Sequence, residues 1–181
     1  TTLSHIHKKA VHLKNETDAQ KVVVDAKQQS YHIESITDKK RVKNPVPPFI
    51  TSSLQQAAAN KLGFAVKKTM TLAQNMYEGV ALQDAKTPQA LITYMRTDST
   101  RLSDTAIDQA RTFVLSEYGK DYLPTKPHLY SKINAAQDAH EAIRPIDISI
   151  TPNDIKPFVS PDIFKLYQLI WYAFFNSYGY Y

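Results

Sequence analysis

The sequence predicts a mainly α-helical protein, preceded by a small piece made of a β-hairpin, a helix and a strand. Apolar residues recur at helical spacing in four segments that follow Pro48, which indicates a helical body. Near the start of the chain, apolar residues partly alternate with polar ones, as they do in short strands. A charged and then proline-rich stretch separates the two patterns, so we expect a domain boundary there.

Composition places the chain among ordinary globular proteins. Of its 181 residues, 43% are hydrophobic and 22% are charged. It has no run of about 18 uncharged apolar residues and no basic-then-apolar leader, so we expect a soluble, cytoplasmic protein. The absence of cysteine excludes disulfides and thiolate metal sites. The net charge of +5 makes a polyanion such as nucleic acid a reasonable partner.

The start of the chain is predicted to belong to a larger β-rich domain. Residues 3–7 and 10–13 have the pattern of a hairpin, and a capping-box spacing at Thr17 starts a helix over residues 18–28. Residues 31–37 return to a strand pattern. Such a piece buries too little surface to be stable alone, so we expect the rest of its domain elsewhere in a longer parent chain.

Three histidines in this piece invite a metal interpretation. They are His5, His7 and His12. Because no carboxylate or thiol partner lies near them at a recognisable ligand spacing, solvated strand residues are the better interpretation. We therefore predict no metal site in this chain.

The connector between the two parts is highly charged over residues 38–44 and is followed by three prolines, at positions 45, 47 and 48. It divides a partial β-rich domain, residues 1–45, from a mostly helical domain, residues 46–181. Its basic run could touch a nucleic-acid backbone, although charge runs are usually solvated links.

Two helices joined by a tight turn are predicted to open the helical domain. A capping-box spacing at residues 52–55 starts a helix that stops before Gly63, and a second helical face runs from Val66 to near Gly79. This is helix-turn-helix geometry at the level of sequence. Lys67 and Lys68 lie where cations could meet DNA phosphates. An ordinary helical hairpin with lysines in solvent fits the same pattern.

The segment 91–103 begins as a short apolar, β-branched strand and continues into Thr, Asp and Ser residues that favour turns and helix caps. If the backbone is extended, Tyr94 and Arg96 point to the same face. A tyrosine hydroxyl beside a permanent cation is suited to phosphate chemistry, because the cation can stabilise a phenolate and a phosphoryl oxygen. A packed ring beside a solvated charge fits the same spacing.

Two later segments complete the helical domain. Ser103 is expected to cap a helix that shares one face through Tyr118 and ends at Gly119. The final segment, residues 161–180, carries an aromatic stripe at helical spacing, which we interpret as core. Between them, an imidazole, a carboxylate and a guanidinium precede a proline, in the order His140, Glu141, Arg144, Pro145.

Several sequence blocks, taken in order, resemble the bacterial type IA DNA topoisomerases. They cover nearly all of residues 48–171, whereas the first 45 residues resemble the preceding segment more loosely. The blocks are PFITSSLQQAA from Pro48, LGF from Leu62, KKTM from Lys67, ITYMRTDST from Ile92, HEAIRP from His140 and LYQLIW from Leu166.

The resemblance implies that Tyr94 attacks a phosphodiester of single-stranded DNA and forms a 5′-phosphotyrosyl link, which lets the parent enzyme relax negative supercoils. Arg96 would hold the scissile phosphate. His140 would lie near the bound DNA, and Arg144 would support the site or contact the DNA backbone. By the same resemblance, Lys67 and Lys68 belong to the helix-turn-helix-like part of the tyrosine-bearing domain.

The resemblance also implies a magnesium-binding Toprim domain upstream in the parent chain. No Asp-x-Asp-x-Glu cluster of that kind occurs in this sequence. We therefore expect this chain to need the remaining domains of its parent and to be inactive alone. The alternative from a different class is a non-enzymatic helix-turn-helix module that binds DNA while Tyr94 merely packs.

Overall fold

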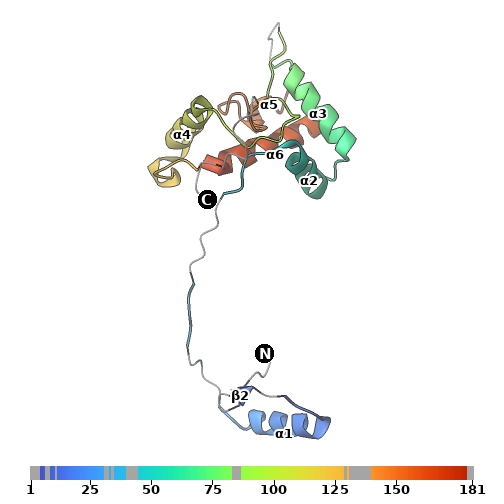
Figure 1. Ribbon diagram of the computed structural model, residues 1–181, viewed down its shortest axis with the longest axis vertical. Coiled ribbons are helices and arrows are strands. Elements are labelled where there is room, and N and C mark those ends of the chain that lie inside the picture. The colour runs from blue at the N-terminus through green and yellow to red at the C-terminus, as the bar shows by residue number, and fades with distance from the viewer. Residues whose placement is uncertain are drawn as a thin grey trace. The chain divides into compact units, whose positions relative to one another are not determined.

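The computed structural model describes residues 5–6, 9–10, 12–30, 33, 35–39, 45–82, 87–128, 130 and 140–178. The chain separates into two compact units, residues 1–42 and 43–181. The first unit holds strands β1 (His5–Ile6) and β2 (Lys9–Ala10) and helix α1 (Glu16–Lys27). The second unit (Figure 1) holds α2 (Thr51–Leu62), α3 (Val66–Glu78), α4 (Asp104–Tyr118), the short 3-10 helix η1 (Lys120–Tyr122), α5 (Pro152–Ile155) and α6 (Pro161–Tyr178).

The first unit contains the predicted antiparallel hairpin, with shorter strands than expected. In its register the facing pairs are His5 with Ala10 and Ile6 with Lys9. The strand predicted over residues 31–37 is wrong for the described part of that range, Ile33 and 35–37, which forms no strand. Ile33 and Ile36 are 78% and 80% exposed, as expected of an extended chain that is not part of a sheet.

Helix α1 is present as predicted but begins two residues earlier. Asn15 caps it, because its side chain accepts a hydrogen bond of 2.9 Å from the N–H of Asp18. The capping box expected at Thr17 is therefore not the start of the helix. None of the residues of α1 is buried in the described structure.

Helix α6 is the centre of the second unit. It packs against α2, α3, α4 and α5, and Figure 1 shows it lying among them. The prediction that its aromatic stripe is core is confirmed, since Tyr167, Trp171 and Phe174 are buried. The buried indole N–H of Trp171 has a hydrogen-bond partner, because it donates to the Ile148 carbonyl at 2.9 Å. Burial raises the pKa of Tyr167, so its hydroxyl stays protonated.

Helices α2 and α3 form the predicted helical hairpin. Gly63 ends α2 with a φ of 68°, a left-handed conformation in which a Cβ would be strained. α2 begins at Thr51, slightly before the predicted capping box, and Ser53 Oγ accepts a 3.0 Å hydrogen bond from the Ile50 N–H. That this hairpin acts as a DNA-binding helix-turn-helix stays a prediction.

Helix α4 follows its predicted cap. The Ser103 Oγ accepts a 3.3 Å hydrogen bond from the Ala106 N–H, and the helix ends before Gly119. Its buried face is formed by Ala106, Ile107, Ala110 and Val114. Within the described ranges, no helix is both long and apolar enough to cross a membrane.

Candidate active site

Tyr94 lies on a segment held between α3 and residues 140–146. The Leu91 N–H donates to the carbonyl of Met76 in α3 at 2.8 Å, and the Leu91 carbonyl accepts from the Ile146 N–H at 3.0 Å. Leu91 itself is 1% exposed. The segment therefore approaches the site as part of the core, with little freedom of position.

The strand predicted in this segment is reduced to a single antiparallel bridge, between Ile92 and Pro145. The chain bends at Thr93 and again directly after Tyr94, through Arg96. The extended backbone that would place Tyr94 and Arg96 on one strand face is therefore not formed. The position of each side chain depends on its own contacts.

Thr51, the first residue of α2, fastens the turn that follows Tyr94. Its N–H donates to the Thr97 carbonyl at 2.9 Å, and its Oγ1 accepts from the Thr97 N–H at 2.8 Å. The same hydroxyl lies 2.8 Å and 2.9 Å from the carbonyls of Met95 and Thr97. The start of α2 thus fixes the backbone that follows the tyrosine in the chain.

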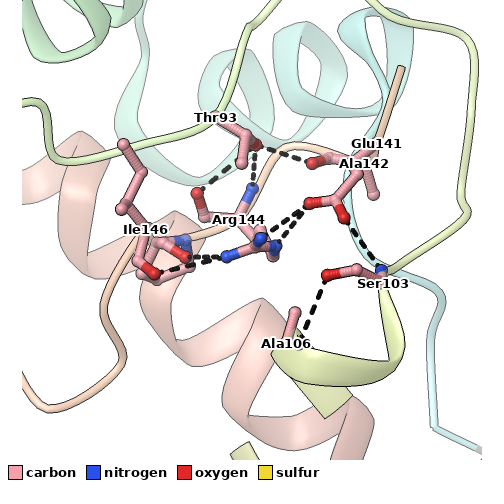
Figure 2. Close-up of polar contacts among 8 residues, drawn as sticks. Thr93, Ser103, Ala106, Glu141, Ala142, Arg144 and Ile146 are labelled. Carbon is pink, nitrogen blue, oxygen red and sulfur yellow. Dashed lines mark hydrogen bonds and ion pairs between the residues drawn. The ribbon is translucent and has the colours of Figure 1, made fainter. Parts of the chain in front are cut away.

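Thr93 fixes the backbone that precedes the tyrosine in the chain. Its N–H donates to the Arg144 carbonyl at 3.0 Å, and its Oγ1 accepts from the Arg144 N–H at 3.0 Å and donates to the Ala142 carbonyl at 2.7 Å (Figure 2). Thr93 directly precedes Tyr94, and Ala142 is two residues from His140. These bonds therefore hold the backbones that carry the phenol and the imidazole next to each other.

Arg144 points into the protein, and its side chain is 13% exposed. Its Nε and Nη2 donate to Glu141 Oε2 at 2.9 and 2.7 Å, and its Nη1 donates to the carbonyls of Pro145 and Ile146. Glu141 Oε1 accepts from the Ser103 N–H at 2.9 Å (Figure 2). Burial acts to raise the pKa of Glu141, but the bonds from Ser103 and the charge of Arg144 outweigh it and lower that pKa.

The Tyr94 ring is partly exposed and lies between two other rings. Tyr77, near the end of α3, meets it edge-on with ring centroids 5.2 Å apart and an interplanar angle of 62°. The His140 ring lies 5.8 Å away at 34°, and His140 is exposed. An accessible phenol on a clamped backbone, beside an imidazole, is an arrangement suited to nucleophilic chemistry.

The basic residues near α3 differ in how they are engaged. Arg96 is exposed, and among the described residues its guanidinium makes no hydrogen bond or ion pair. Together with Lys67 it lines an open groove along α3. Lys68 is engaged within the protein, because its Nζ lies 2.7 Å from Asp162 Oδ2 and 4.3 Å from the centre of the Phe64 ring.

The structure brings Tyr94 and His140 together and leaves Arg96 and Lys67 accessible beside α3. It turns Arg144 inward, where its guanidinium binds Glu141, and the two roles predicted for Arg144 stay predictions. Tyr77 lies within the helix predicted from Val66 to near Gly79, but the sequence gives it no role in the site, and it predicts no partner for Glu141. No spacing in the sequence reveals the ring contact between Tyr77 and Tyr94, because it arises where two separate segments meet.

The three histidines near the start of the chain are His5, His7 and His12. His7 lies outside the described residues. In the part of the chain that the structure describes, no group of three or more His, Asp or Glu side chains is placed to hold a metal ion.

Comparison with known proteins agrees with the resemblance. A family model described as DNA topoisomerase matches residues 2–179. DNA topoisomerase 1 of Rickettsia bellii (strain RML369-C) is 47% identical over 173 residues, which cover 93% of this chain and 21% of that protein. DNA topoisomerase 1 of Helicobacter pylori (strain J99) is also 47% identical over 173 residues, covering 93% of this chain and 23% of that protein.

A solved structure shares the fold as well. Full-length topoisomerase I from Thermotoga maritima matches with a TM-score of 0.64 and 44% sequence identity, over 76% of this chain and 21% of that chain. The chain spans about a fifth of the length of these relatives. These matches do not favour a stand-alone helix-turn-helix module. This chain belongs to the bacterial DNA topoisomerase I family, of type IA.

Proposed function

We propose that this chain carries the DNA-cleaving tyrosine of a type IA topoisomerase and that Tyr94 is the nucleophile. The position of Tyr94 is the observation that supports this most directly. Its ring is partly exposed on a backbone clamped on both sides, with His140 beside it. Arg96, two residues further on, has no side-chain partner among the described residues. Tyrosines that only fill the core of this domain, such as Tyr167 and Tyr178, are buried instead.

In the proposed reaction, a bond forms between the Tyr94 Oη and phosphorus while the bond from phosphorus to the 3′ oxygen breaks. The phenol loses its proton and the departing 3′ oxygen gains one, so the products are a 5′-phosphotyrosyl link and a 3′-hydroxyl. One phosphoester replaces another, and rejoining is the reverse step without ATP. Arg96, with a permanent charge and five donors, is suited to holding the non-bridging phosphate oxygens.

The whole protein is proposed to act on single-stranded DNA and to relax negative supercoils, with the remaining domains of the parent chain as partners. Magnesium would be held by residues of its Toprim domain, since the described residues of this chain offer no cluster of ligands for it. The chain would be inactive alone for that reason. A cytoplasmic location is part of this proposal.

The test is a covalent-adduct assay with full-length protein, magnesium and a labelled single-stranded oligonucleotide. The native protein should form an adduct, and Tyr94→Phe should form none because only the hydroxyl is removed. Tyr122→Phe is the matched control, since Tyr122 is an exposed tyrosine on η1, and it should form the adduct normally. An adduct from the Tyr94→Phe protein would overturn the assignment.

A second experiment separates this proposal from a module that only binds DNA. This chain is mixed with a separately produced Toprim-bearing part of its parent in the presence of magnesium. Only the enzyme proposal predicts that cleavage then appears. Persistent binding with no cleavage, by the mixture and by the full-length protein, would favour the helix-turn-helix alternative.

A further inference from the structure

One face of α3 forms a polar stripe that leads away from Tyr94. Its members recur at helical spacing and, with Arg96, line an open groove of about 540 Å³. They are Lys67, Thr71, Gln74, Asn75 and Glu78. Tyr77, which precedes Glu78 in α3, contacts the Tyr94 ring, so Tyr94 lies near the Glu78 end of the helix, and Lys67 lies near the other end.

Lys67 is a cation in an electrostatically unfavourable place. It is in the first turn of α3, where the helix dipole disfavours positive charge. Its neighbour Lys68 is compensated by Asp162, but among the described residues the Lys67 ammonium has no hydrogen-bond or ion-pair partner. A bound anion at this end of α3 would compensate the charge of Lys67.

The groove offers mostly donors. Within the described residues, the side chains of Arg96 and Asn75 make no hydrogen bond, so their N–H groups are available. Gln74 uses one amide N–H on the Glu78 carboxylate and keeps the other, and Thr71 donates to the Lys67 carbonyl at 3.0 Å. Glu78 is the one carboxylate in the lining, and Gln74 already engages it.

The length of the groove suits a short stretch of single strand. Lys67 and Glu78 are eleven residues apart, which is about 16 Å along a helix. Phosphates of a stacked strand follow one another at about 3.4 Å, and at wider intervals when the strand is stretched. The groove therefore takes at most about five nucleotides.

We propose that this groove binds the backbone of the DNA strand that stays joined to Tyr94, on the 3′ side of the break. This inference rests on the proposed function, because it uses the polarity of the 5′-phosphotyrosyl link. Arg96 contacts the phosphates next to the break, Asn75 and Gln74 donate to those that follow, and Lys67 neutralises the farther end. The strand thus runs in the 5′ to 3′ direction from Tyr94 towards the start of α3.

The first measurement is equilibrium binding of full-length protein to a fluorescent single-stranded oligonucleotide at several salt concentrations. Lys67→Ala should reduce the slope of log K against log salt by about 0.7, the amount for one phosphate contact on a single strand. Lys120→Ala is the matched control, because Lys120 is an exposed lysine on η1, and it should leave the slope unchanged. Equal slopes for the two variants would overturn the proposal.

The second measurement locates the strand. With the 5′ arm of the oligonucleotide kept constant, the affinity of native protein should rise as the 3′ arm grows from about one to about five nucleotides. Lys67→Ala should flatten this dependence. Asn75→Asp should weaken binding of the long 3′ arm more than Lys67→Ala does, because the new carboxylate repels the phosphates. If Lys67→Ala instead flattens the dependence on the 5′ arm, the groove holds the other side of the break and the proposal fails.

The two proposals can fail separately. If the native protein forms the adduct and Lys67→Ala changes the dependence of affinity on neither arm length, only the proposal about the groove is rejected. No adduct from the native protein would reject the proposed function, and the salt slopes would still decide whether the groove binds DNA. A thermal unfolding midpoint for Lys67→Ala equal to that of the native protein shows that the variant is folded.

Discussion

Glu141 joins Arg144 to the start of α4, because one of its carboxylate oxygens accepts from Nε and Nη2 of Arg144 and the other accepts from the Ser103 N–H. The pair is close in sequence, yet it connects two segments that are far apart in the chain. The guanidinium of Arg144 is thereby engaged within the protein. Arg96 is exposed and, among the described residues, unpaired, so of these two arginines it is the one available to a ligand.

Arg144→Lys should lower the free energy of unfolding by about 1–3 kcal/mol, the range for hydrogen bonds to charged groups. A lysine cannot make the parallel pair of bonds to Glu141 and reach the carbonyls of Pro145 and Ile146 as well. Urea denaturation measures the difference. Arg101→Lys, at an exposed arginine, is the control and should change stability by no more than about 0.5 kcal/mol. Equal losses in the two variants would contradict the supporting role of Arg144.

The Glu141 ion pair should make stability depend on pH in acid. The pKa of Glu141 is lowered from its usual 4.5 in the folded protein, so its stabilising effect is fully present above that value. The effect is lost as the pH falls through the folded-state pKa. Unfolding free energies of native protein and Glu141→Gln should therefore converge between about pH 6 and about pH 3. A constant gap across that range would show that another group is responsible.

Thr51→Val should loosen the turn after Tyr94. The valine keeps the shape of threonine but leaves the buried Thr97 N–H without its 2.8 Å acceptor, at a cost of about 1–3 kcal/mol. Formation of the covalent adduct should slow as well, because the backbone that positions the nucleophile is less restrained. Thr51→Ser retains the hydroxyl and should behave like the native protein in both measurements. A normal rate of adduct formation in Thr51→Val would show that the hydrogen bonds of Thr51 to the turn are not needed for catalysis.

Tyr77→Ala should slow adduct formation by about two- to tenfold, the range that corresponds to the energy of an edge-on aromatic pair. The removed ring is the one that meets Tyr94 at 5.2 Å. Tyr77→Phe keeps the ring and should retain the native rate. Tyr77 is 39% exposed, so the alanine variant should remain folded, which thermal unfolding checks. A native rate in Tyr77→Ala would mean that Thr93 and Thr51 position Tyr94 without help from this ring.

The long helices were predictable because their signals are local, whereas the short α5 and η1 were not predicted. The Ser103 cap, the left-handed Gly63 and the apolar spacing of the last helix each act within a few residues, so they can be read directly from the sequence. The strands were less predictable. Residues 31–37 and the segment around Tyr94 have strand-like patterns, but a strand forms only where a partner lies alongside, and no short-range pattern specifies that partner.

By itself, the sequence predicted Tyr94, Arg96 and His140 as site residues. The residue types of Tyr94 and Arg96 suit phosphate chemistry, and the resemblance to one family adds His140. The tertiary structure decided what each cation can do. Arg144 and Lys68 are engaged by Glu141 and Asp162, whereas Arg96 and Lys67 have no such partner among the described residues. The physical reason is that the availability of a charge depends on which groups the fold brings next to it, and in the case of Lys68 that group comes from a distant helix.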